Sequence, residues 1–331
     1  MSQDKSTRLP ARPRIVFMGT PDFAVPSLEA LVAHDHHLQA VVTQPDRPRG
    51  RSGKSAPPPV KQVAKRLGVE VLQPERASDE SFCRRMGAIS PDLLVVIAFG
   101  QVLKEHFLNI PSWGGLNIHA SLLPRYRGAA PIQRAVMNNE HETGLTAMRM
   151  EQGLDTGPIL LQEKTHIGTH ETAGELHDRL AGTSATFLLK TLERLTQNAI
   201  HETPQDDTLA TYAPKIDRTT GRISWDRPAD HVSALIRGLD PWPGAYTTIN
   251  GKTLKLFSSR VVSTGDAGTV PGRVQMGSDE GLLVETADGV ILAGALQLAG
   301  KKRLNASDFL RGFPLKPGTL LGPGNLLGKT K

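Results

Sequence analysis

Cysteine is nearly absent from this sequence, which has a single residue of this type, Cys83, among 331. One cysteine cannot form an intrachain disulfide, and this composition is typical of proteins that work in a reducing compartment. We therefore expect a cytoplasmic protein. Because free cysteines are usually buried, we interpret Cys83 as a structural residue rather than as a nucleophile.

Aromatic residues and long apolar runs are also scarce. Aromatic side chains make up 5% of the chain, and no apolar run reaches the roughly 18–20 residues that span a bilayer. The first residues, 1–14, are polar and lack the apolar core of a signal peptide. We expect no membrane association, and we expect residues 1–13 to form a disordered tail.

Acidic residues are outnumbered in one part of the chain. The formal net charge is +6, and residues 221–331 hold 14 Lys and Arg against 9 Asp and Glu, a net of +5. A basic module can bind a polyanion by neutralising its phosphates and releasing counterions. Solubility alone explains such an excess equally well, so charge by itself leaves the choice open.

The length suggests two domains. Short apolar segments alternate with helical periodicity up to about residue 200, which predicts an α/β domain with a largely parallel sheet over 14–200. Its strands are expected at 14–19, 38–43, 93–98, 116–119, 146–150 and 159–163, and its helices at 27–32, 60–67, 132–137 and 176–195. Gly182 is a possible break in the last helix.

The remainder of the chain has a different pattern. Residues 201–220 are polar and weakly periodic, and we interpret them as a linker. One helix is expected at 229–239, with short strands at 246–249, 253–257, 272–276, 281–286 and 290–297. Short strands separated by glycines predict a small β-barrel over 221–331.

Polar residues suited to acyl transfer occur in two segments. Residues i and i+2 of a strand share a face, so Asn117 and His119 can point at one small volume. Asp155 lies in a separate loop between Gly153 and Gly157. An amide and an imidazolium can donate to an oxyanion, and a carboxylate can accept the proton of an attacking amine. Taken singly, each residue also has an ordinary structural explanation, such as a loop cap or a turn residue.

Three other chemistries are disfavoured by the sequence. Ser121 lacks the G-x-S-x-G context of a serine nucleophile. The turn at Gly19 follows a strand but lacks the G-x-G-x-x-G pattern of dinucleotide binding. The histidines within residues 34–37 have no matching Cys or carboxylate spacing, so no metal site is expected.

Several motifs carry a resemblance that runs in order along almost the whole chain. They are FMGTPDFA from Phe17, QPDRP from Gln44, NIHASLLPRYRGAAPIQ from Asn117, GLDTG from Gly153, ISW from Ile223 and PWP from Pro241. Together these motifs resemble the methionyl-tRNA formyltransferase family. The resemblance implies a Rossmann-like N-terminal domain and a smaller OB-like barrel at the C-terminus.

The same resemblance assigns functional residues. It implies 10-formyltetrahydrofolate as the formyl donor and the α-amino group of initiator methionyl-tRNA as the acceptor. The catalytic set would be Asn117, His119 and Asp155, with the first two holding the oxyanion while Asp155 orients His119 and manages the amine's proton. Folate contacts are expected from two segments, namely Ser121, Leu122, Leu123 and Pro124 in one, and Ile97, Phe99, Gly100 and Val102 in the other.

Two basic segments are candidates for tRNA binding. In the family, the loop that here holds Arg47, Arg51 and Lys54 reaches toward the acceptor end of the tRNA. Lys301 and Lys302 form a second basic patch in the C-terminal part. Phosphate contacts of this kind position a nucleic acid without reading its sequence. A solvated charged loop remains the alternative explanation of the first segment.

Two other functions remain open beside the leading one. Another folate-dependent formyltransferase would act on an amino-sugar nucleotide or on a glycinamide ribonucleotide, but the second type has no C-terminal barrel. A catalytically inactive, tRNA-binding relative is the non-enzymatic alternative, and the intact Asn117, His119 and Asp155 argue against it. We expect the protein to be a monomer.

Overall fold

A computed structural model describes residues 8–48, 55–265, 268–275 and 280–322 of the chain. The chain forms two compact units that are interleaved in sequence. The first unit contains Met1–Gly128, Thr143–Thr165 and His177–Tyr212, and the second contains Ala129–Glu142, His166–Leu176 and Ala213–Lys331.

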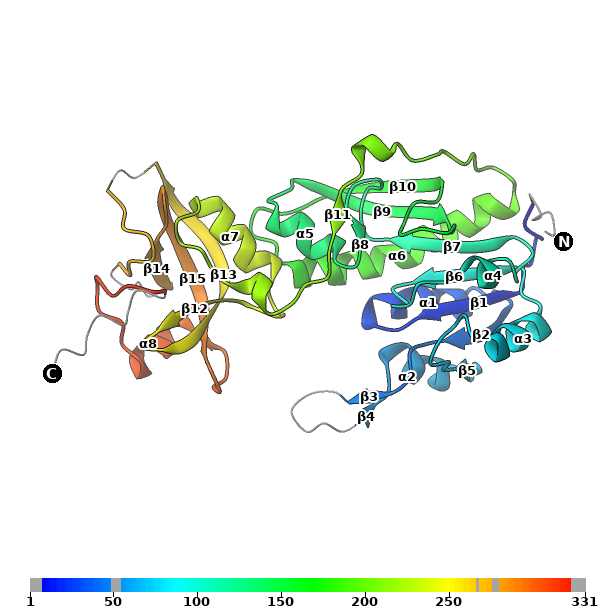
Figure 1. Ribbon diagram of the computed structural model, residues 1–331, viewed down its shortest axis with the longest axis horizontal. Helices are drawn as coiled ribbons and strands as arrows, with labels where there is room; N and C mark the ends of the chain where they lie inside the picture. The colour runs from blue at the N-terminus through cyan, green and yellow to red at the C-terminus, as the bar shows by residue number, and fades with distance from the viewer. Residues whose placement is uncertain (1–7, 49–54, 266–267, 276–279, 323–331) are drawn as a thin grey trace. The chain divides into compact units, whose positions relative to one another are not determined.

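The first unit contains a seven-stranded sheet with the strand order β10-β9-β7-β6-β1-β2-β5 (Figure 1). Its strands are β1 (Ile15–Gly19), β2 (Leu38–Val42), β5 (Val71–Leu72), β6 (Leu93–Ile97), β7 (Gly114–His119), β9 (Glu142–Arg149) and β10 (Ile159–His166). The strands from β7 to β5 are parallel to their neighbours, and β9 is antiparallel to β7. The predicted α/β class with a parallel core is confirmed.

The helices of this unit are η1 (Asp22–Ala24), α1 (Val25–Ala33), α2 (Pro59–Arg66), α3 (Glu80–Ile89), α4 (Glu105–Leu108), α6 (Ala173–Thr196) and η2 (Asp207–Leu209), the first turn of α6 belonging to the second unit. The helices from η1 to α4 connect the parallel strands in sequence, whereas α6 and η2 follow β10. A buried hydrogen bond of 2.9 Å between Ser27 and Ser184 joins α1 to α6. On α3, Cys83 is half-buried, and this burial raises the pKa of its thiol.

Both faces of the parallel strands are buried. Val16 and Met18 of β1 belong to the same apolar cluster as Phe82 of α3. The alternate residues Ile15 and Phe17 point to the opposite face and are also fully buried. Burial on two faces explains why these strands are continuous apolar runs rather than alternating patterns.

Helix α6 is continuous through Gly182, so the break considered there is absent. A glycine inside a helix costs only about 1 kcal/mol relative to alanine. Leu180 and Leu188 on either side are almost completely buried, and their burial outweighs that cost.

The segments expected to be a disordered tail, 1–13, and a linker, 201–220, contain ordered structure in their described residues. Leu9 is buried at 1% exposure and Arg12 donates to the Asp35 carboxylate at 2.8 Å, so residues 8–13 are packed rather than disordered. Residues 1–7 lie outside the described part. The segment 201–220 contains η2 and strand β11 (Tyr212–Ala213), which pairs with β8 (Arg127–Gly128).

The second unit contains helices and a five-stranded sheet in which β12, β13, β15 and β14 are neighbours in that order and β16 pairs with β15. Its elements are α5 (Pro131–Met137), η3 (Thr219–Gly221), α7 (Ala229–Gly238), β12 (Ala245–Ile249), β13 (Lys252–Thr264), β14 (Leu282–Glu285), β15 (Gly289–Leu298), β16 (Leu304–Asn305) and α8 (Ala306–Gly312). Of the strand expected at 272–276, the described residues show only single bridges at Arg273 and Val274. Trp225 is buried in the core, and its indole nitrogen donates to Thr247 Oγ1 at 3.1 Å.

Packing assigns residues 129–142 and 166–176 to the second unit. Helix α5 lies so close to α7 that a Cβ on Gly238 would clash with the Met137 side chain. Arg237 donates to the Glu171 carbonyl and to Asn139 Oδ1, both at 3.0 Å. In the part of the chain that the structure describes, none of the helices is long and apolar enough to cross a membrane.

Candidate active site

Asn117 and His119 lie on β7, where the parallel part of the sheet meets the antiparallel strand β9. They are alternate residues of the strand, so they share one face, and they are 8% and 7% exposed. The side-chain amide of Asn117 has no hydrogen-bond partner among the described residues. Its amide atoms are not among the fully buried, unpaired polar atoms of the described residues, so they remain accessible to a ligand.

His119 is held by the backbone of a neighbouring segment. Its Nε2 atom lies 2.9 Å from the carbonyl oxygen of Tyr126. Because a carbonyl oxygen can only accept, Nε2 carries the hydrogen and donates it. The other ring nitrogen, Nδ1, therefore faces the predicted catalytic carboxylate.

Asp155 is close to His119 but does not bond to it directly. The distance from His119 Nδ1 to Asp155 Oδ2 is 3.7 Å, which is too long for a hydrogen bond and short enough for an ion pair when the ring is protonated. The same Oδ2 atom accepts a hydrogen bond of 2.8 Å from the Gly128 N–H. Contrary to expectation, the Tyr126 carbonyl, and not Asp155, makes the hydrogen bond that orients the ring.

The loop that carries Asp155 contains backbone conformations that few residue types adopt. Asp155 itself adopts a φ of 56°, in the left-handed region that aspartate tolerates better than most residues. Gly153 has a φ of 140°, which also favours glycine. A Cβ on Gly157 would overlap the carbonyl oxygen of Arg149, so only glycine fits there. These two glycines allow the loop to present the carboxylate to His119.

The two expected folate segments follow neighbouring strands. Phe99 lies just after β6, and its carbonyl accepts hydrogen bonds from Thr20 Oγ1 at 2.8 Å and from Gln44 Nε2 at 3.2 Å. The strand order reverses between β1 and β6, and ligands of open α/β sheets bind at such a point, outside the carboxyl ends of the strands. The segment after β7 begins beside it, because β7 pairs with β6.

Within these segments the side chains differ in their accessibility. Ile97 and Phe99 are buried, as is the Ser121 side chain, whose hydroxyl donates to the Arg125 carbonyl at 2.6 Å. Any ligand contact of these residues therefore involves their backbone. Val102, in contrast, is 79% exposed and offers an apolar surface. The remaining predicted residues are Gly100, with a φ of 87°, and Leu122, Leu123 and Pro124, of which Leu123 is buried.

The predicted basic residues are only partly described. Arg47 is exposed on β3 (Arg47–Pro48), which pairs with β4 (Ser55–Ala56), and it forms an ion pair with Glu75 at 3.1 Å. Arg51 and Lys54, between these strands, lie outside the described residues.

In the second unit, Lys301 and Lys302 are exposed in the turn after β15. Neither lysine has a carboxylate partner in the part of the chain that the structure describes. The next residue, Arg303, instead pairs with the buried Asp240 at 2.7 Å. The two lysines thus remain available to a polyanion, whereas the arginine stabilises its own unit.

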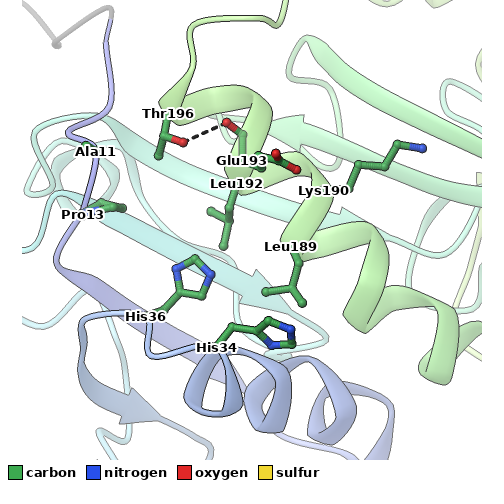
Figure 2. A pocket seen from close by; sticks show the side chains of 9 residues that line it. All are labelled: Ala11, Pro13, His34, His36, Leu189, Lys190, Leu192, Glu193 and Thr196. Atoms are coloured by element: carbon green, nitrogen blue, oxygen red, sulfur yellow. Dashed lines mark hydrogen bonds between the residues drawn. The ribbon is translucent and has the colours of Figure 1, made fainter.

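A cavity of about 380 Å³ lies elsewhere in the first unit, between the end of α1 and the C-terminal half of α6 (Figure 2). His34 and His36 line one side of it and Lys190 and Glu193 line another. Burial lowers the pKa of His36, and the nearby His34 adds to the effect. The described residues contain no group of three or more His, Cys, Asp or Glu side chains placed to hold a metal ion.

Sequence reasoning missed residues that support the site. Arg127 lies within the matched motif but had no role assigned, and Gln205 lies in the segment interpreted as a linker. Gln205 Nε2 donates to the carbonyl oxygens of Asp155 at 2.8 Å and Gly157 at 2.7 Å. These contacts join residues about fifty positions apart, so no local pattern indicated them.

Two family models match the chain, one in its N-terminal part and one in its C-terminal part. Residues 13–192 match the family model described as formyl transferase, and residues 215–314 match that of the formyl transferase C-terminal domain. A sugar 3N-formyl transferase whose structure was solved with dTDP and 5-N-formyl-THF has a TM-score of 0.64 at 20% identity, covering 88% of this chain and 99% of that one. At this identity the likeness concerns the fold.

Curated relatives are much closer in sequence. The methionyl-tRNA formyltransferase of Moorella thermoacetica is 50% identical over 309 residues, which cover 93% of this chain and 99% of the relative. That of Pelobacter propionicus is 49% identical over 308 residues, covering 93% and 96%. Such identity over nearly the full length of both chains shows the family, and this chain belongs to the methionyl-tRNA formyltransferases.

Proposed function

We propose that this protein transfers the formyl group of 10-formyltetrahydrofolate to the α-amino group of initiator methionyl-tRNA. The observation that carries the proposal is the convergence of Asn117, His119 and Asp155 in a chain that is 50% identical to a methionyl-tRNA formyltransferase. The family relationship supports the substrate pair, and the site supports the chemistry of acyl transfer to nitrogen.

In the proposed reaction, the amine nitrogen attacks the formyl carbon, and the new C–N bond forms as the bond to N10 of the folate breaks. The amide of Asn117 and a protonated Nδ1 of His119 donate to the oxygen that becomes negative in the transition state. Asp155 accepts the proton that the amine loses. A proton is returned to N10 as tetrahydrofolate leaves, so the reaction is balanced without an external acid or base.

Binding of the donor is assigned to the crevice outside β6 and β7. The exposed side chain of Val102 and the free amide of Asn117 support this assignment, since they offer one apolar and one polar contact. Main-chain groups of Ile97, Phe99, Gly100 and Ser121–Pro124 complete the proposed site. The formyl group would then lie beside Asn117 and His119, because β7 carries these two residues and the segment Ser121–Pro124 follows β7 directly.

Binding of the tRNA is assigned to Arg47, Arg51, Lys54, Lys301 and Lys302. Two observations support the surface formed by Lys301 and Lys302. These lysines have no carboxylate partner among the described residues, and residues 221–331 have a net charge of +5. We further propose that residues 14–200 act as the catalytic domain, that 201–220 connect it to an OB-like tRNA-binding barrel at 221–331, and that the protein is a cytoplasmic monomer.

A formylation assay tests the proposal directly. Purified protein is supplied with 10-formyltetrahydrofolate and either charged initiator tRNA, charged elongator tRNA or an amino-sugar nucleotide. We expect rapid formylation of the initiator tRNA and none of the sugar nucleotide. Transfer to the sugar alone would support the amino-sugar alternative, and tRNA binding without any formylation would support the inactive relative.

A further inference from the structure

The side-chain amide of Gln205 forms hydrogen bonds with a buried arginine and with the loop that carries Asp155. Its Oε1 atom accepts hydrogen bonds from Arg127 Nε at 3.0 Å and Arg127 Nη2 at 2.8 Å. Its Nε2 atom donates to the backbone carbonyls of Asp155 and Gly157. Arginine can only donate and a carbonyl can only accept, so the orientation of the amide is unambiguous and all of its hydrogen-bonding capacity is used.

Arg127, which donates to this neutral amide, is a charged residue that is only 2% exposed. Its carboxylate contact is with Asp207 at 2.7 Å, and the Asp207 side chain is 82% exposed. Solvent therefore screens the carboxylate side of this ion pair. Burying a charged group is expensive unless it is hydrogen-bonded, and Gln205 accepts two of the hydrogen bonds of this guanidinium.

Three consecutive residues hold the catalytic pair. The Tyr126 carbonyl accepts from His119, and the Gly128 N–H donates to the Asp155 carboxylate. The side chain of Arg127, between them, reaches the Asp155 backbone through Gln205. The segment is itself fixed, since the Arg127 N–H donates to the Thr211 carbonyl at 2.9 Å.

The loop needs such support because its backbone is not in a low-energy conformation. A left-handed conformation costs a residue other than glycine roughly 1–2 kcal/mol, and Asp155 adopts it between two glycine positions. Without Gln205, two carbonyls of the loop would lose their donors. A displacement of the reacting groups by about 1 Å can lower a rate on the order of 100-fold.

We infer that Gln205, held by Arg127, is a positioning residue that sets the placement of the Asp155 carboxylate for formyl transfer. The inference rests on the proposed function, because it concerns the same reaction. It assigns a catalytic purpose to a segment that connects elements and carries no recognisable motif of its own.

The test compares Gln205→Glu with Asp207→Asn. The glutamate retains the acceptors for Arg127 but has no hydrogen to donate to the two carbonyls, so the loop loses its anchor while the arginine keeps its partner. We expect kcat to fall about 100-fold, with KM for both substrates and the Kd for tRNA within about threefold of wild type. Asp207→Asn removes the charge of the exposed carboxylate, leaves the hydrogen bonds of Gln205 in place, and should retain the wild-type rate.

The second variant is Gln205→Met, because the methionine side chain has a similar shape and no polar hydrogen. All rates are normalised to the fraction of the purified protein that binds tRNA. A normal kcat in either variant overturns the inference. So does an equal loss of kcat and tRNA affinity, or failure of both variants to fold, because these are results of a purely structural role. If wild type itself does not formylate charged tRNA, the proposed function fails, which is a different outcome.

Discussion

His119 is hydrogen-bonded through one ring nitrogen, and its other ring nitrogen faces the Asp155 carboxylate. The hydrogen bond from Nε2 to the Tyr126 carbonyl fixes the plane of the ring, and Nδ1 is left 3.7 Å from the Asp155 carboxylate. This separation is too long for a direct bond, and the carboxylate itself accepts from the Gly128 N–H. In the proposed mechanism, His119 donates to the oxyanion and Asp155 accepts the amine's proton.

We expect His119→Ala and Asp155→Asn each to lower kcat by roughly 1,000-fold. His119→Ala removes a donor to the oxyanion, which costs on the order of 10²–10³ in kcat. Asp155→Asn removes the proton acceptor, and general acid–base catalysis contributes on the order of 10²–10⁴. Binding of tRNA should be retained, because neither residue belongs to the basic surfaces. The measurements are single-turnover formylation and equilibrium tRNA binding.

Glu151→Gln provides a matched control for these two variants. Glu151 is an exposed carboxylate near Asp155 in the same loop, and its substitution removes one negative charge from the same region. We expect wild-type rates from this control. Near-normal turnover in Asp155→Asn or His119→Ala would contradict the mechanism.

At the scale of an element, α6 shows how tertiary burial overrides local propensity. Gly182 is exposed in the interior of this helix, and no atom lies within 4 Å of the position its Cβ would take. Gly182→Ala should therefore stabilise the protein by about 0.5–1 kcal/mol, since alanine has less conformational entropy to lose. Urea denaturation at pH 7 measures the change.

Gly174 in the same helix is the counterpart. A Cβ there would come within 2.7 Å of Pro241 Cδ, so Gly174→Ala should destabilise the protein. If both substitutions stabilised the protein, local helix propensity would outweigh packing, and the explanation given for α6 would be wrong.

The start of the central sheet depends on a charged contact. The backbone and side chain of Arg14, just before β1, donate to Asp92, just before β6, with distances of 2.8–3.1 Å. The hydrogen bond from the Arg14 side chain is the main reason why the pKa of Asp92 is lowered. A carboxyl whose pKa is lowered on folding stabilises the fold above its unfolded pKa of about 3.9, and this contribution is lost as the pH falls through the folded value.

Asp92→Asn should accordingly lower the melting temperature at pH 7. The difference between wild type and variant should narrow as the pH falls below about 4, where the Asp92 carboxyl of the unfolded chain becomes protonated, and it should close as the pH falls through the lower pKa of the folded state. Thermal unfolding between pH 7 and pH 2.5 measures it. Glu80→Gln, which breaks the exposed ion pair with Arg84 on α3, should show no such dependence, and a constant difference for Asp92→Asn would refute the account.

At the scale of the whole molecule, positive charge is concentrated in the C-terminal third. Lys301→Ala combined with Lys302→Ala should weaken tRNA binding and reduce the slope of log affinity against log salt concentration by about one per lost phosphate contact. The KM for the folate donor should stay unchanged. Lys190→Ala, which removes a single positive charge paired with Glu163 in the first unit, is the control, and equal salt slopes in all proteins would exclude the lysine surface.

Much of this organisation was predictable from the chain. The parallel strands were found because burial on both faces makes them continuous apolar runs, and Asn117 and His119 were paired because a strand has a period of two. The interleaving of the units was not found. It depends on α5 packing against α7, a contact between residues about a hundred positions apart that leaves no mark on local periodicity.

The sequence by itself determined the α/β class, the family and the identity of the three predicted catalytic residues. These properties follow from local patterns and from motifs whose residues lie close together along the chain. Only the tertiary structure decided how those residues meet: that a carbonyl orients His119, that the Asp155 carboxylate accepts from a backbone N–H, and that Gln205 supports its loop. Hydrogen bonds between distant segments are specified by the folded backbone, because direction and distance, rather than residue type alone, decide whether they form.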